Sequence, residues 1–559
     1  MKRLYCLFIL ILYLAISIPS YAQFTINGKN IIYDKQNDTY MACIPEDAFG
    51  KDYEAIILLD IASDWSDLSI DGTQIAYSYT FKQVEGNKLY SIHARKGNKE
   101  INTKITFTFL PLLVLQGSFG YDYAQGSMSL YSSDATEPTI SLIKAKWRGG
   151  STNTADKHKR NYKIKSINFK GKSQDISLLG MREDNNWIMD AGQIDLFRLR
   201  NRIATEIWND FATKPYYASK EPKAKSGVTG KVVEVILNNE YRGIYSLTEA
   251  MDRKELKLKK YDDKNQEFHG QLWKVSSWDK ATFWDIDKDY DNTQETWHAF
   301  ETKYPDIEDV NPTDYSPLYE AIDFVVNSND ETFKKEVGDY FDIPVLIDYQ
   351  LFLETLKPVD NNGKNMYWGI YDVAKSKKLT LAIWDLDASV GQDWHCSTPL
   401  HPDYVLPNTD LGVKDVFNLY HRLSSLNVDN YNGKVASRYQ ELRKTYFSEE
   451  NLISRYQGYY DMLVKSGAAS REECKWSKDS DIGGYPLNFK SEIEYIKNWI
   501  INRLSYLDSN QFPVSTNISE IHQKESLSTK TTYNMLGQKV GASYQGLKIK
   551  NGKKFYTTK

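Results

Sequence analysis

Apolar and polar residues follow the short period of β-strands between about residue 24 and residue 140. EAIILLD (54–60), QIAYSYTF (74–81) and KITFTFLPLLVL (104–115) are rich in β-branched and aromatic residues, which fit a pleated sheet. Asp-Gly and Gly-Asn turn signals separate such stretches. The pattern predicts an all-β, sandwich-like domain over residues 23–135.

From residue 136 to residue 510, strand patterns are mixed with helical ones. AGQIDLFRLRNRIATEIWNDFA (191–212) repeats apolar residues at helical spacing. VVEVILNNEYRGIYSLTEA (232–250) reads as two strands joined around Asn238 and Asn239, residue types that tolerate positive φ. Helical patterns prevail after about residue 410. The mixture predicts an α+β fold.

Both ends of the chain carry separate signals. Lys2 and Arg3, an apolar run to Ile18 and Ser20-Tyr21-Ala22 form the pattern of a cleaved signal peptide, predicted over residues 1–22. We therefore expect a secreted protein, in the periplasm or at the cell surface, with no later membrane span. A polar linker is predicted at 511–529 and a small β tail at 530–559.

Charge and cysteine content narrow the function classes. The net charge is −4 with no dominant basic tail, which argues against a nucleic-acid partner. Beyond the signal peptide the cysteines are Cys43, Cys396 and Cys474, too few for a disulfide framework. A Cys396–Cys474 bridge and three unpaired thiols both remain open.

Candidate chemistry lies in KPVDNNGKNMYWGIY (357–371) and LTLAIWDLDASVG (379–391). Asp360 and Asn365 follow a predicted helix, and Asp385 and Asp387 end a predicted strand. This is the order of a kinase C-lobe, where a loop Asp positions the acceptor and Asn and Asp bind the metal. Oxygen ligands of this kind suit Mg²⁺.

Three further segments carry a family resemblance: KAKWRGGSTNTADKHKRNYKIK (144–165), NNWIMDAGQIDLFRLRNRIATEIW (185–208) and VEVILNNEYRGIYSLTEAMD (233–252). In this order, and with the 357–391 segments, they resemble the CotH kinases, which are related to atypical protein kinases. The resemblance covers roughly residues 140–510. Gly150 stands where the family usually has Asn, and Asn239 where Gly is typical.

The resemblance implies a two-lobed, atypical-kinase-like fold after the β domain. It also implies ATP and Mg²⁺ or Mn²⁺ as cofactors, and a nucleotide and a protein acceptor as partners. Asp360 would be the catalytic residue, with Asn365, Asp385 and Asp387 at the metal. The implied nucleotide-binding residues are Arg148, Lys163, Lys165 and Glu249, with Glu206 a weaker partner for the lysine.

Ordinary alternatives exist for these residues and for the whole protein. Strand-end carboxylates and solvated strand lysines are common without a ligand. A kinase-like pseudoenzyme or surface-binding protein acting through the β domain, or a structural protein whose tyrosines face carbohydrate, are the other function classes. An active kinase is favoured because a pseudoenzyme has no physical need for Asp360, Asn365 and Asp385 together. The acceptor, and phosphoryl against nucleotidyl transfer, stay open.

The tail has a resemblance of its own. NMLGQKV (534–540) and GLKIKNGKKF (546–555) are similar to the C-terminal sorting modules of some Bacteroidetes surface proteins. The resemblance implies that the tail is a sorting signal and has no catalytic role.

Overall fold

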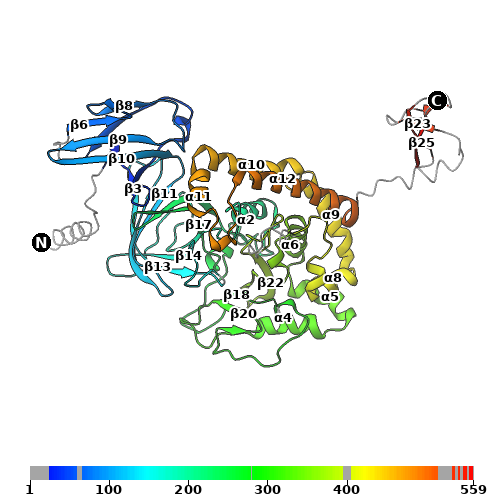
Figure 1. The fold of residues 1–559 in the computed structure, drawn as a ribbon. Helices are drawn as coiled ribbons and strands as arrows, with labels where there is room; N and C mark the ends of the chain where they lie inside the picture. The colour runs from blue at the N-terminus through cyan, green and yellow to red at the C-terminus, as the bar shows by residue number, and fades with distance from the viewer. Residues whose placement is uncertain are drawn as a thin grey trace. The chain divides into compact units, whose positions relative to one another are not determined.

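The computed structural model describes residues 24–59, 66–150, 152–278, 280–393 and 405–513, and four short strands beyond residue 531. It divides into two units, Met1–Leu504 and Ser505–Lys559. Strands prevail in the N-terminal part of the first unit and helices in its later part (Figure 1), so the predicted α+β class is confirmed. No helix among the described residues is long and apolar enough to cross a membrane.

The N-terminal part contains two sheets that share one hydrophobic core. One sheet has the strand order β2-β1-β5-β8 and the other β3-β4-β10-β9-β6-β7. Rings of Phe81, Tyr90 and Phe107 meet edge to face in this core. The strands are β1 (Phe24–Ile26), β2 (Lys29–Asn30), β3 (Ile32–Asp34), β4 (Thr39–Cys43), β5 (Tyr53–Leu59), β6 (Ser66–Ile70), β7 (Thr73–Gln74), β8 (Ser78–Phe81), β9 (Tyr90–Lys96) and β10 (Lys99–Thr108), with the 3₁₀ turn η1 (Glu46–Ala48).

A closed barrel follows, with the strand order β11-β12-β13-β14-β15-β17-β16. Its strands are β11 (Leu112–Gln116), β12 (Ala124–Tyr131), β13 (Thr139–Arg148), β14 (Asn161–Ile167), β15 (Asn186–Asp190), β16 (Gly230–Leu237) and β17 (Glu240–Glu249). The predicted hairpin turn is confirmed, with Asn238 at φ 52° and Asn239 at φ 62°. The predicted domain boundary at 135/136 falls between β12 and β13, which pair inside this barrel. The pairing favours an earlier boundary, near residue 110.

Helices and a five-stranded sheet complete the first unit. The sheet order is β19-β20-β18-β21-β22, with β18 (Gln271–Val275), β19 (Thr296–Trp297), β20 (Phe300–Tyr304), β21 (Met366–Asp372) and β22 (Ser376–Ile383). The helices are α2 (Arg200–Phe211), α3 (Arg253–Leu256), α4 (Ser316–Asn327), α5 (Asp330–Tyr340), α6 (Ile343–Leu356), α7 (Val413–Val416), α8 (Asn418–Ser425), α9 (Tyr431–Arg443), α10 (Glu449–Lys465), α11 (Ala468–Trp476) and α12 (Phe489–Tyr506). The 3₁₀ turns are η2 (Lys280–Thr282), η3 (Val359–Asn361), η4 (Val428–Asn430) and η5 (Ser480–Ile482).

The second unit contains one π-helical turn, η6 (Leu507–Gln511), and one small sheet. Its strand order is β24-β23-β25-β26, with β23 (Thr532–Asn534), β24 (Lys539–Val540), β25 (Gly546–Lys550) and β26 (Lys553–Thr557). The role of this tail, like the two-lobed kinase-like arrangement, stays a prediction.

The predicted signal peptide lies outside the described residues, as does Cys396. Cys43 and Cys474 carry free thiols.

Candidate active site

The loop after α6 brings Asp360 and Asn365 into direct contact. The helix ends where Lys357 adopts the left-handed conformation (φ 50°). Asn365 Nδ2 then donates to Asp360 Oδ2 at 2.8 Å, and Lys364 Nζ lies 2.8 Å from the same oxygen. Trp278 Nε1 donates to Asp360 Oδ1 at 3.0 Å. Because the amide nitrogen of Asn365 is committed to Asp360, its Oδ1 is left to accept a hydrogen bond or to bind a cation.

The second pair of carboxylates, Asp385 and Asp387, follows the hairpin of β21 and β22. Asp385 has a positive φ of 60°, so the chain turns sharply at this residue. Ala388 N donates to Asp387 Oδ1 at 2.9 Å. Burial raises the pKa of Asp387 well above its usual range, and the carboxylates of Asp385 and Asp190 raise it further. Such a group of like charges is stable in its ionised form only when a cation balances it.

Asp190 joins this cluster from the barrel and was not among the sequence candidates. It ends β15, where its Oδ1 accepts from Gly192 N at 3.0 Å and its Oδ2 from Asn201 Nδ2 at 2.7 Å. Burial raises its pKa, and Asp385 adds to the effect. The signal in the sequence was the same one that marked Asp385, an Asp closing a buried apolar strand. Asn201 also accepts from Leu386 N at 3.1 Å, which ties α2 to the segment after β22.

The side-chain types of these residues are those that bind a divalent cation. Carboxylate oxygens from three separate segments and one amide oxygen are hard ligands of the kind Mg²⁺ prefers. Asp385 and Asp190 line a cavity of about 20 Å³, which is room for roughly one water molecule or a small ion. A nucleotide needs the surrounding side chains to move apart. The other cavity walls include Arg148, Ile188, Asn201, Thr248 and Trp384.

Positive side chains stand on the barrel side of the cavity. Arg148 lies over the Trp384 ring, with its Cζ 5.3 Å from the ring centroid. Lys163 and Lys165 share the outer face of β14, because the residues that alternate with them, Tyr162 and Ile164, belong to the barrel core. Burial lowers the pKa of Lys163, and the nearby positive charges of Lys165, Lys146 and Arg148 lower it further. Lys163 therefore lies within electrostatic range of Arg148, which favours it as the phosphate-binding lysine.

Lys274 on β18 is a second residue that sequence reasoning missed. Burial lowers its pKa, against the opposite effect of the Asp385 carboxylate. It reaches the cluster from a strand more than 100 residues away from β14. No short-range spacing links Lys274 to the other candidates, so the sequence offered no signal for it.

The contacts of Glu249 and Glu206 favour structural roles. Glu249 is buried, and its two oxygens accept from Arg182 N at 2.8 Å and Thr229 N at 3.2 Å. The residues of β17 that line the cavity, Ser246 and Thr248, belong to the opposite face of the strand. Glu206 accepts from the Tyr459 hydroxyl at 2.6 Å and pairs with Arg202 at 3.3 Å. A nucleotide role for Glu249 stays a prediction.

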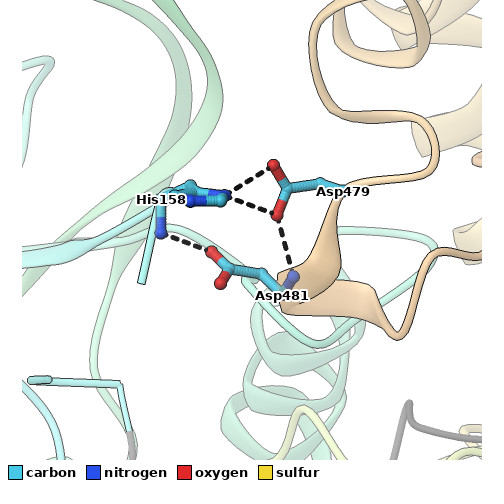
Figure 2. Close-up of side chains that lie close together, drawn as sticks. All are labelled: His158, Asp479 and Asp481. Carbon is cyan, nitrogen blue, oxygen red and sulfur yellow. Dashed lines mark hydrogen bonds and ion pairs between the residues drawn. The ribbon is translucent and has the colours of Figure 1, made fainter. Parts of the chain in front are cut away.

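His158, Asp479 and Asp481 form a second group of metal-ligand type (Figure 2). His158 Nδ1 lies 2.9 Å from Asp479 Oδ2. Asp481 Oδ2 accepts from the backbone N–H groups of His158 and Lys159 at 2.7 and 2.9 Å. These bonds fasten the segment before β14 to the turn η5. They use the same atoms that a metal would need, so the group is satisfied as a hydrogen-bonded anchor.

A family model described as CotH kinase protein matches residues 145–507, which is more than half of the chain. The matched stretch contains Asp360, Asn365, Asp385 and Asp387, together with the lysines of β14. No curated protein matches the chain.

Proposed function

Because the chain belongs to the CotH kinase protein family, we propose that it is a secreted kinase acting on proteins outside the cytoplasm. It transfers a phosphoryl group from Mg-ATP to a Ser or Thr hydroxyl, or to another acceptor. The observation that carries the proposal is the meeting of Asp360 and Asn365 beside a half-buried group of strand-end carboxylates. A structural turn has no need to gather like charges in this way.

Each residue has a distinct task in this reaction. Asp385, Asp387 and Asn365 would hold Mg²⁺, which when bound neutralises phosphate charge. Arg148 and Lys163 bind and orient the phosphate oxygens from the barrel side.

Asp360 binds the hydroxyl group of the acceptor. Trp278 and Lys364 hold its carboxylate in place, so that it can orient the acceptor hydroxyl and accept its proton.

The test compares the mature chain with Asp385→Ala and with Asp263→Ala, a control at an exposed carboxylate. Millimolar Mg-ATP is expected to raise the melting temperature of the wild type and of the control by several degrees. Asp385→Ala is expected to lose this shift. Transfer of label from γ-labelled ATP identifies a phosphotransferase, whereas transfer from α-labelled ATP identifies a nucleotidyltransferase. A wild type that does not respond to Mg-ATP contradicts the proposal.

A second function, ligand or partner binding by a kinase-like pseudoenzyme, is favoured by one observation in the N-terminal part. A cavity of about 170 Å³ is lined by residues that include Lys29, Cys43, Tyr53 and Glu137. Lys29 Nζ donates to the Ser133 carbonyl at 2.8 Å on its wall. This function becomes the leading one if Mg-ATP has no effect.

A further inference from the structure

The outer face of β13 and β14 carries four lysines beside the candidate active site. Lys144 and Lys146 on β13 stand directly opposite Lys165 and Lys163 on β14. Their side chains point away from the barrel core, because the core takes the alternate residues of both strands. We name these four residues the lysine face. Arg148, two positions beyond Lys146 on the same side of β13, lines the active-site cavity.

The lysine face is unfavourable for the protein alone. Like charges directly opposite each other on neighbouring strands are destabilising, and here two such pairs follow one another. Among the described residues, no carboxylate lies within 4.0 Å of any of the four ammonium groups. Lys146 and Lys165 instead share the Tyr123 ring, each 4.9 Å from its centroid. This concentration of positive charge occurs in a chain whose net charge is −4.

Acidic side chains of the chain itself approach this face without neutralising it. The segment after β20 carries the exposed residues Asp306 and Glu308. Asp306 acts electrostatically on Lys163 and on Lys303, and Glu308 acts on Tyr123. The approach of this segment indicates that carboxylates borne on a polypeptide can reach the lysine face.

The face extends away from the cavity along β13. An antiparallel strand rises about 3.4 Å per residue, so Lys144 stands roughly 14 Å from Arg148, a span of about four residues of extended polypeptide. Leu142 continues the same side of the strand and is 37% exposed. The row therefore runs from the phosphate end of the site to an exposed apolar residue.

We propose that the acceptor is an acidic polypeptide segment whose carboxylates bind Lys144, Lys146 and Lys165 of the lysine face, while Lys163 binds the phosphate and the hydroxyl of the segment reaches Asp360. This proposal rests on the proposed function and names the substrate class of the same site. Charge complementarity selects the segment and speeds its encounter with the enzyme. The exposed end of the face at Leu142 accommodates an apolar side chain of the segment.

The experiment measures binding of two fluorescent peptides that carry one central Ser flanked by four Glu or by four Gln residues. The proteins are the mature wild type, Lys144→Glu/Lys146→Glu, and the matched control Lys170→Glu/Lys172→Glu at exposed positions in the turn that follows β14. A third peptide with four Lys residues tests whether charge reversal also reverses the preference. The Mg-ATP melting shift of each protein reports separately on the nucleotide site and on folding.

The wild type and the control are expected to bind the Glu peptide at least 10-fold more tightly than the Gln peptide. Lys144→Glu/Lys146→Glu is expected to lose this preference and to bind the Lys peptide best. Equal binding of Glu and Gln peptides, or a preference that survives the Lys144→Glu/Lys146→Glu change, overturns the proposal. Equally tight binding of a single-stranded oligonucleotide overturns the assignment to a polypeptide. Loss of the Mg-ATP shift with the Glu preference intact rejects the kinase function alone.

Discussion

Two groups of charged side chains, one buried around Glu472 and one half-buried around Asp387, are both assembled from distant segments but differ in their partners. Around Glu472 on α11, Lys159 Nζ and Arg198 Nε each lie 2.7 Å from Oε1, and Ile244 N donates to Oε2 at 2.8 Å. The pKa of Asp387 is raised mainly by burial, and the carboxylates of Asp385 and Asp190 raise it further. The Glu472 carboxylate has direct cationic partners, whereas other carboxylates are the main charged neighbours of Asp387.

The difference supports a structural role for the Glu472 network and the proposed cation-binding role for the Asp387 group. Gly243 belongs to the Glu472 network, because a Cβ at this position would lie 2.0 Å from Glu472 Oε2. The glycine of the β17 motif thus admits a carboxylate that joins α11 to the barrel. Among the described residues, no cationic side chain lies within 4.0 Å of the Asp387 carboxylate, so a bound cation is the simplest counter-charge for it.

The largest expected effect is a loss of stability when Glu472 loses its charge. Glu472→Gln leaves Lys159 and Arg198 buried without their counter-charge, and removing one partner of a buried pair costs about 3–5 kcal/mol. Urea denaturation should show this loss in the free energy of unfolding. Glu494→Gln, at an exposed carboxylate on α12, should change stability by less than about 0.5 kcal/mol. Equal stability of the two variants would mean that the Glu472 network contributes nothing.

Removing one charge from the group around Asp387 is expected to increase stability instead. Asp387→Asn removes one of several like charges, and each pKa unit of relief corresponds to about 1.4 kcal/mol. In EDTA the variant should therefore be more stable than the wild type by about 1–3 kcal/mol. Added Mg²⁺ should stabilise the wild type and leave the variant nearly unchanged. Destabilisation of the variant in EDTA would show that Asp387 is balanced by the protein itself.

The smallest effect is the pH dependence of the metal-free protein. The pKa values of Asp387 and Asp190 are raised in the folded chain by burial, and Asp385 adds to both. Above the unfolded pKa of about 4, the folded chain therefore binds more protons than the unfolded chain, and its stability falls as pH rises. In EDTA these groups should make the wild type more stable at pH 5 than at pH 7 by about 1 kcal/mol.

Asp387→Asn is the control for this pH dependence. The difference between pH 5 and pH 7 should shrink in the variant, because one of the two titrating groups is gone. A difference of unchanged size would assign the pH dependence to other groups.

Local patterns predicted several elements and one contact of the candidate site. Of the helical pattern over 191–212, only Arg200–Phe211 form a helix, α2, and the residues before it form turns. The turn at Asn238 and Asn239 and the polar loop after the helix that ends at Leu356 appear as predicted. Asp360 and Asn365 were predicted as a pair from a spacing of five residues, and they touch. These features depend on interactions within one turn or one hairpin, which the sequence pattern reflects directly.

The pairing of strands that are distant in the sequence could not be predicted from local patterns. β11 and β12 look like further strands of the N-terminal domain, yet they close the barrel by pairing with β16 and β13. Lys274 and Asp190 could not be joined to Asp385 by spacing, since Asp190 comes from the barrel and Lys274 from a strand of the five-stranded sheet more than 100 residues before Asp385.

The sequence by itself determined the α+β composition, the CotH family membership and the residue types able to bind metal and phosphate. Only the tertiary structure decided which carboxylates lie together, which lysines share an unpaired face, and that Glu249 is held by backbone amides. The physical reason is that burial and neighbouring charge, which turn an ordinary Asp or Lys into a reactive one, arise from segments that meet only after the barrel and the five-stranded sheet have formed.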